Sequence, residues 1–157
     1  MWSFRISKVR CPLISKDIPQ LLVVDDDPED LLLIRTAVNR SKVPLQVNCY
    51  GGGEEFLLAL DTLVEESAPV VGGGSLLIVF LDLNMPRKDG RSCLKDIRRD
   101  DRYTDIPVIV FSTSASDEDI LRSYELGANS YICKPDDLES LERIIKEVYR
   151  YWFGSYH

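Results

Sequence analysis

The stretch LLIVFLDLNMPRKDG, residues 76–90, carries the strongest fold signal in this chain. It begins with an apolar run, Leu76 to Leu81, and then changes at once to an acid, Asp82, and a turn at Met85-Pro86. An uninterrupted apolar run of this length is typical of a strand buried on both faces, as in parallel sheets. A carboxylate at the end of such a strand is costly to bury without a partner. We therefore expect Asp82 to lie in a solvent-facing crevice or beside a cation, unless it only caps the next turn.

The composition fits one globular domain. The chain has 157 residues, of which 45% are hydrophobic and 29% are charged. A net charge of −7 argues against a general affinity for nucleic acid or for anionic membranes, both of which reward basic patches. No run approaches the roughly 20 apolar residues of a membrane span. The four cysteines lack metal-like spacing, so we expect reduced, mostly buried thiols and a cytoplasmic location.

Short apolar runs alternate along the chain with segments of helical periodicity. Strands are expected at residues 21–24, 46–50, 76–81, 106–111 and 130–133, and helices from residue 28 onward and at 54–66, 90–101, 117–126 and 137–152. Alternation at this spacing requires right-handed crossovers and a parallel sheet covered on both faces. The pattern predicts a doubly wound α/β fold of the (βα)5 type.

The acidic segment DDDPED, residues 25–30, follows the first expected strand. Asp27 is placed to cap the following helix, Pro28 suits its first position, and the two acids after it complement the positive end of the helix dipole. This structural explanation leaves Asp25 and Asp26 unexplained.

All strand carboxyl ends of a parallel sheet share one edge, so five polar side chains are expected to meet there. These are Asp25, Asp26, Asp82, Ser112 and Lys134. Clustered carboxylates repel one another unless a cation intervenes, and an all-oxygen site suits a hard ion such as Mg²⁺. A lysine and a hydroxyl opposite them could bind a phosphoryl group. Asp82 would then be the nucleophile that forms an aspartyl-phosphate.

Over about residues 20–150 the chain resembles the receiver domains of bacterial two-component response regulators. The resemblance rests on four segments: VVDDD at 23–27, LDLNMPRKDG at 81–90, PVIVFSTS at 107–114 and LGANSYICKP at 126–135. It implies a flavodoxin-like, CheY-like five-stranded sheet with strand order 2-1-3-4-5. The domain is expected at residues 20–153, after a mobile extension at 1–19 and before a tail at 154–157.

The resemblance also implies the chemistry of the acids. Asp82 corresponds to the phosphoacceptor. Mg²⁺ would be bound by Asp26, Asp82 and the backbone carbonyl of Asn84, with Asp25 contributing through a water molecule.

The same resemblance implies the roles of residues on the later strands. Ser112 corresponds to the switch hydroxyl, Tyr131 to the switch aromatic and Lys134 to the phosphate-binding lysine. Pro135 would follow a cis peptide that helps to aim this lysine. Thr113 departs from the family pattern, because it is bulkier than the usual alanine or glycine.

The chain is most similar to the small response regulators paired with bacterial phytochromes, through LDLNMPRKDGR, SYELGANSYICKP and the late aromatic segment YWF at 151–153. This implies a single-domain response regulator rather than an enzyme. It would accept a phosphoryl group from a sensor histidine kinase of the phytochrome type. It would then signal to a downstream protein through the surface of residues 117–126, 130–133 and 137–152.

The last expected helix predicts self-association. Ile144, Tyr151 and Phe153 lie off its inward stripe and are expected to stay partly exposed, and aromatic residues are enriched in interface cores. We therefore expect a homodimer formed through this helix face, the commonest oligomer of soluble proteins. The alternative is that the rings fold back onto the domain.

Three other functions are compatible with parts of the pattern. A degenerate receiver would act only as an interaction scaffold. A phosphatase of the haloacid dehalogenase type would need an acid two residues after its nucleophile, where this chain has Asn84. A flavodoxin-like electron carrier would need a phosphate-binding loop where this chain has the acids of 25–30.

Overall fold

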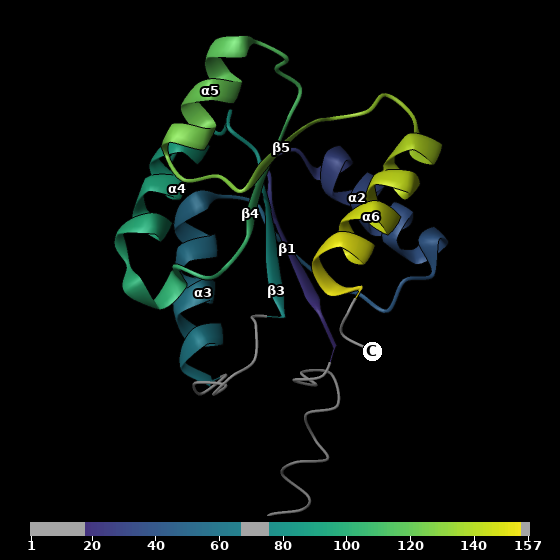
Figure 1. The fold of residues 1–157 in the computed structure, drawn as a ribbon, viewed down its shortest axis with the longest axis horizontal. Helices are drawn as coiled ribbons and strands as arrows, with labels where there is room; N and C mark the ends of the chain where they lie inside the picture. Colours follow the sequence, from purple (N-terminus) through teal and green to yellow (C-terminus); the bar gives the residue numbers. More distant parts are fainter. Residues whose placement is uncertain (1–17, 67–75, 155–157) are drawn as a thin grey trace, which may run out of the picture.

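The chain folds as a doubly wound α/β domain, in which five parallel strands form one sheet in the order β2-β1-β3-β4-β5 (Figure 1). The computed structural model describes residues 18–66 and 76–154. The strands are β1 (Gln20–Val24), β2 (Gln46–Tyr50), β3 (Leu77–Leu81), β4 (Val108–Ser112) and β5 (Ser130–Cys133). The helices are α2 (Pro28–Ser41), α3 (Gly53–Glu66), α4 (Gly90–Arg99), the 3-10 turn η2 (Asp101–Tyr103), α5 (Asp117–Glu125) and α6 (Leu138–Phe153). The predicted fold class and strand order are confirmed.

The helices form two layers that cover opposite faces of the sheet. Helices α2 and α6 lie on one face, and α3, α4 and α5 on the other (Figure 1). Successive side chains of a strand point to opposite faces of the sheet, so one strand can contribute residues to both cores. In β3, Ile78 and Phe80 pack with the α2–α6 core, whereas Val79 and Leu81 pack with the α3–α4 core. The central strand is therefore buried on both faces, as its apolar run predicted.

Several helix ends follow from local side-chain chemistry. Asp27 caps α2 by accepting a hydrogen bond from the backbone N–H of Glu29, with Pro28 at the first helical position. After α5, Gly127 has a φ of 106°, a left-handed value that suits glycine. These caps were predicted.

The segment after α4 differs from the prediction. A helix was expected over 90–101, but α4 ends at Arg99 and η2 follows. Asp100 takes an extended conformation and its carboxylate accepts a hydrogen bond from the backbone N–H of Arg102, so it caps the new turn instead of continuing the helix. Strand β4 likewise starts at Val108, two residues later than predicted.

The carboxyl-terminal helix corrects another expectation. Phe153 was expected to stay partly exposed, but it is buried and its ring lies 5.8 Å from that of Tyr149. The two residues are four positions apart and so share one helix face, which makes the buried stripe of α6 wider than predicted. Ile144 packs against the same core, whereas Tyr151 is 79% exposed.

The three cysteines within the described ranges follow the prediction only in part. Cys49, Cys93 and Cys133 are free, but only Cys93 is buried, because Cys49 is half-buried and Cys133 is exposed. The prediction of buried thiols is therefore confirmed for Cys93 and wrong for Cys133, which is exposed. Most of the expected extension at 1–19 and of the tail at 154–157 lies outside the described residues.

Within the described ranges, none of the helices combines the length and the apolar character that a membrane span requires.

Candidate functional site

Two of the predicted acids are held by backbone bonds at the ends of neighbouring strands. The N–H of Asp25 donates to the carbonyl of Tyr50 over 3.0 Å, and the N–H of Asp82 donates to the carbonyl of Val24 over 3.0 Å. A Cβ atom added to Gly90 would lie 2.0 Å from the carbonyl oxygen of Asp82. Glycine therefore lets the start of α4 approach the end of β3.

A cavity of about 370 Å³ opens at this edge of the sheet. Most of the residues predicted for the site line it: Asp25, Asp26, Asp82, Asn84 and Lys134, together with Asp27, Asp30 and Thr113. The sheet topology thus gathers side chains from the ends of β1, β3 and β5, as in other open α/β sheets. Ser112, which was predicted to join them, does not line the cavity.

Lys134 is the cation of the cavity. Its Nζ lies 2.7 Å from Asp25 Oδ2, 2.8 Å from Asp30 Oδ2 and 3.6 Å from Asp82 Oδ2, and its side chain is only 10% exposed. The prediction of a cis peptide before Pro135 is wrong, because the described residues contain only trans peptides. The trans form is the lower in energy for most peptide bonds before proline.

Asp30 is a residue of the site that the sequence did not reveal as one. It was interpreted only as an acid that complements the dipole of α2. In the folded chain it lies in the first turn of α2 and reaches Lys134 across the cavity. The available signal was its place in the first turn of a helix that starts directly after the end of β1, because that turn adjoins the edge of the sheet where the strand ends gather.

The carboxylates of Asp25, Asp26 and Asp82 can converge on one point. One oxygen from each lies within 4.8 Å of the others. Three carboxylate oxygens are the hard ligands that Mg²⁺ or Mn²⁺ prefers. The donor set fits a divalent cation with the remaining positions left to water or to a ligand.

The electrostatics of the site indicate unbalanced negative charge. Burial raises the pKa of Asp82 to about 6; the acids beside it add to the increase, while Lys134 and a backbone hydrogen bond from Asn84 oppose it. Burial also raises the pKa of Asp25, although its hydrogen bond to Lys134 acts in the opposite direction. Burial lowers the pKa of Lys134, but hydrogen bonds to Asp25 and Asp30 outweigh it and the pKa is raised overall. One lysine does not neutralise this group, so a second cation is favoured.

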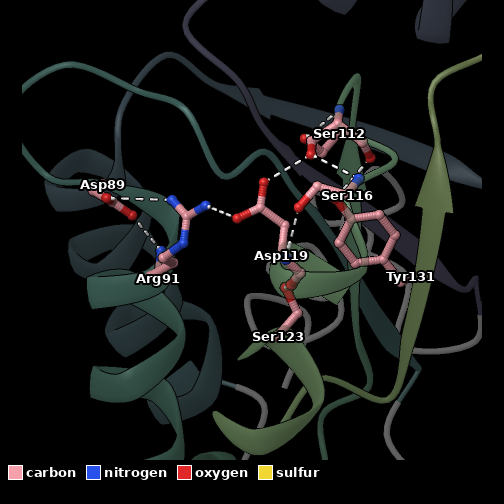
Figure 2. A network of polar contacts seen from close by, with 8 residues as sticks. Asp89, Arg91, Ser112, Ser116, Asp119, Ser123 and Tyr131 are labelled. Carbon is pink, nitrogen blue, oxygen red and sulfur yellow. Dashed lines mark hydrogen bonds and ion pairs between the residues drawn. The ribbon is translucent and has the colours of Figure 1, made fainter. Parts of the chain in front are cut away.

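Ser112 and Tyr131 both form hydrogen bonds with the backbone of Ser114. Ser112 is fully buried, and its Oγ accepts a hydrogen bond from the N–H of Ser114 over 3.2 Å (Figure 2). The hydroxyl of Tyr131 donates to the carbonyl of Ser114 over 2.9 Å. Alternation along β4 puts Ser112 on the same face as Val110, which turns its hydroxyl away from the cavity. Thr113 lines the cavity in its place.

Comparison with known proteins identifies related sequences and structures. The model of the response regulator receiver domain family matches residues 21–146. A probable methanogenesis regulatory protein, FilR2 of Methanothrix harundinacea, is 37% identical over 85% of this chain and 83% of its own. The phosphorylated cyanobacterial phytochrome response regulator RcpA is 32% identical, with a TM-score of 0.69 over 87% of this chain and 94% of its own. The Mn²⁺-bound response regulator Rcp1 is 27% identical, with a TM-score of 0.67 over 87% and 96%.

Proposed function

The chain belongs to the response regulator receiver domain family, and from this we propose that it accepts a phosphoryl group on Asp82 from a sensor histidine kinase. One observation carries the proposal: Asp82 is one of three acids suited to a divalent cation, and the Nζ of Lys134 is 3.6 Å from its carboxylate. The protein would then be a signalling protein rather than an enzyme, with the receiver domain at residues 20–153 and a location in the cytoplasm.

The metal in this proposal is Mg²⁺. Asp26, Asp82 and the carbonyl of Asn84 would bind it directly, and Asp25 through a water molecule. When bound, it supplies positive charge that offsets the charge of the incoming phosphoryl group. Asp25 is shared between the metal set and Lys134, whereas Asp30 belongs to the lysine alone. Asp30 therefore keeps the ammonium group in the cavity while Asp25 responds to the metal.

The residues of this chain would perform the remaining steps. A carboxylate oxygen of Asp82 attacks the phosphorus atom, and the bond from phosphorus to the donor's histidine nitrogen breaks. Lys134 then exchanges part of its ion pairing for a phosphoryl oxygen. Ser112 would turn its hydroxyl toward the same group, and Tyr131 would move with it. Such a switch biases two pre-existing states, because the phosphoryl group binds one of them better.

The proposed partners follow from the relatives and from one surface. The likeness to the phytochrome response regulator RcpA supports a kinase of the phytochrome type. We place signalling to a downstream protein, and homodimer formation, on the face of α5, β5 and α6. Tyr151 and Trp152 line a groove of about 620 Å³ there, beside Ile132 of β5. Light scattering of Tyr151→Lys against the native chain, with and without beryllofluoride, tests the dimer; a native monomer in both conditions contradicts it.

Phosphorylation by acetyl phosphate tests the function directly. With Mg²⁺, the native chain should gain one acid-stable, base-labile phosphoryl group, and Asp82→Asn should gain none. Mass spectrometry should map the label to Asp82. A label on Asp25 or Asp26 would contradict the assignment, and absence of any label would indicate the scaffold function. Steady turnover of phosphomonoesters would indicate a phosphatase instead.

A further inference from the structure

Ser114, in the loop between β4 and α5, is the centre of a hydrogen-bond network that joins Ser112, Tyr131 and Asp119. Its N–H donates to Ser112 Oγ, and its carbonyl accepts from Tyr131. Its own hydroxyl donates to Asp119 Oδ2 over 2.7 Å and accepts from the N–H of Ser116 over 3.2 Å. One residue thus contacts both proposed switch residues, and its side chain is held from α5.

Asp119 is held in turn by a different helix. Its Oδ1 accepts a hydrogen bond from Arg91 of α4 over 2.6 Å. Arg91 lies in the first turn of α4, beside the capping residue Asp89, whose carboxylate accepts from the backbone N–H of Arg91. Figure 2 shows the guanidinium group of Arg91 directed at Asp119 across the space between the two helices.

This ion pair links the two loops that border the cavity. The loop from β3 to α4 contributes Asn84 to the cavity, and the loop from β4 to α5 contributes Thr113. Arg91 lies in the first turn of the helix after the first loop, and Asp119 lies in the first turn of the helix after the second. Neither Arg91 nor Asp119 lines the cavity, so they act on the site only through the loops.

We propose that Arg91 and Asp119 form a clasp that holds the loop at 113–116 in its resting arrangement, in which Ser114 engages both Ser112 and Tyr131. They are positioning residues for the switch. The inference rests on the proposed function. For the Ser112 hydroxyl to reach a phosphoryl group on Asp82, its contact with the Ser114 N–H must lengthen, and the loop anchored by Asp119 must shift.

The exposure of the clasp is suited to a switch. The side chains of Arg91 and Asp119 are 29% and 26% exposed, so water can solvate both charges when they separate. Ion pairs that water can reach contribute little to stability. The resting state is therefore favoured by an amount that ligand binding at Asp82 can overcome.

Binding of beryllofluoride with Mg²⁺ to the full chain tests the clasp. Arg91→Gln and Asp119→Asn should each tighten beryllofluoride binding by about two- to fivefold, because each releases the resting loop. The double variant should bind no more tightly than the better single variant, which is the coupling that a double-mutant cycle measures. The exposed residues Arg99 and Glu118 provide charge-matched controls as Arg99→Gln and Glu118→Gln.

The signs of the two effects on beryllofluoride binding distinguish release of the loop from a simple change in charge. Arg91→Gln removes a positive charge and Asp119→Asn a negative one, so their effects on an anionic ligand would have opposite signs if only charge mattered. Opposite shifts, or shifts no larger than those of the controls, overturn the proposal.

A second measurement does not depend on phosphorylation. In the metal-free protein, both variants should speed hydrogen exchange of the Ser114 amide and shift the NMR signals of the Tyr131 ring, while the controls leave both unchanged. Unchanged exchange in both variants overturns the clasp. A native chain that binds no beryllofluoride contradicts the proposed function instead, and the exchange data still decide on the clasp.

Discussion

Two networks of charged side chains, one around Lys134 and one around Arg91, lie at the same edge of the sheet. They differ in how far their side chains are buried. In the cavity, the Lys134 side chain is 10% exposed and its partners Asp25 and Asp82 are 2% and 9% exposed, and only its third partner, Asp30, is more exposed, at 28%. In the clasp, the corresponding values for Arg91 and Asp119 are 29% and 26%. Charges that cannot reach water need a permanent partner, whereas partly exposed charges can separate at little cost. The cavity is therefore suited to holding a charged ligand and the clasp to opening.

The two networks also differ in charge balance. The cavity pairs one lysine with Asp25, Asp30 and Asp82, which leaves negative charge for a metal to offset. In the clasp, the guanidinium group of Arg91 lies 2.6 Å from Asp119 and 3.6 Å from Asp89, and Asp119 also accepts a hydrogen bond from the Ser114 hydroxyl. Ligand binding should therefore change the cavity's electrostatics directly and the clasp only through movement.

The largest expected effect is the loss of the buried cation. Lys134→Met should lower the free energy of unfolding by about 3 kcal/mol at neutral pH, because Asp25 and Asp82 lose their shared partner. Urea denaturation measures it, with the exposed Lys146→Met as the control. Mg²⁺ should restore part of the loss. Equal stabilities of the two variants would remove the distinction between buried and exposed pairs.

A pH titration should show the cost of ionising Asp82. Its pKa in the folded chain is raised from 3.8 to about 6, so the folded state binds the proton more tightly than the unfolded state does. Its contribution to stability is therefore complete below about pH 4 and is lost as the pH rises toward 6. In metal-free protein, Asp82→Asn should become more stable than the native chain over this range, by on the order of 2 kcal/mol. A pH-independent difference between the two would contradict this assignment.

Within the cavity, neighbouring acids should differ in their effect on the metal. Asp26→Ala should weaken Mg²⁺ binding by about tenfold or more, because it removes a direct ligand. Asp27→Ala should change it less than about threefold, because Asp27 caps α2 and acts only through its charge. Calorimetric titration gives both values. Equal losses would show that the roles of the two acids are wrongly divided.

The smallest expected effect is on the stability of the clasp. Arg91→Gln should change the free energy of unfolding by less than about 1 kcal/mol, and the difference should shrink as salt is added. Urea denaturation at low and high salt measures it against Arg99→Gln. A loss as large as that of Lys134→Met would mean that the clasp is a rigid structural pair rather than one that opens.

Much of the fold was predictable because its signals are local. The apolar run before Asp82, the cap at Asp27 and the turn at Gly127 each depend on a few consecutive residues. Phe153 was misplaced because helical periodicity defines a stripe but not its width. How much of a helix is covered depends on how it sits against the sheet and against its neighbour, here α2.

The amino-acid sequence alone specifies which side chains end the strands, and parallel strands bring all their carboxyl ends to one edge. These two facts are enough to predict that Asp25, Asp82 and Lys134 lie close together. The partners of the charged groups depend instead on tertiary packing: Lys134 pairs with Asp30, 104 residues away, and Arg91 with Asp119, 28 residues away. Such pairs require elements from different parts of the chain to lie at a particular distance. That distance is set by the packing of their buried faces, which no local spacing records.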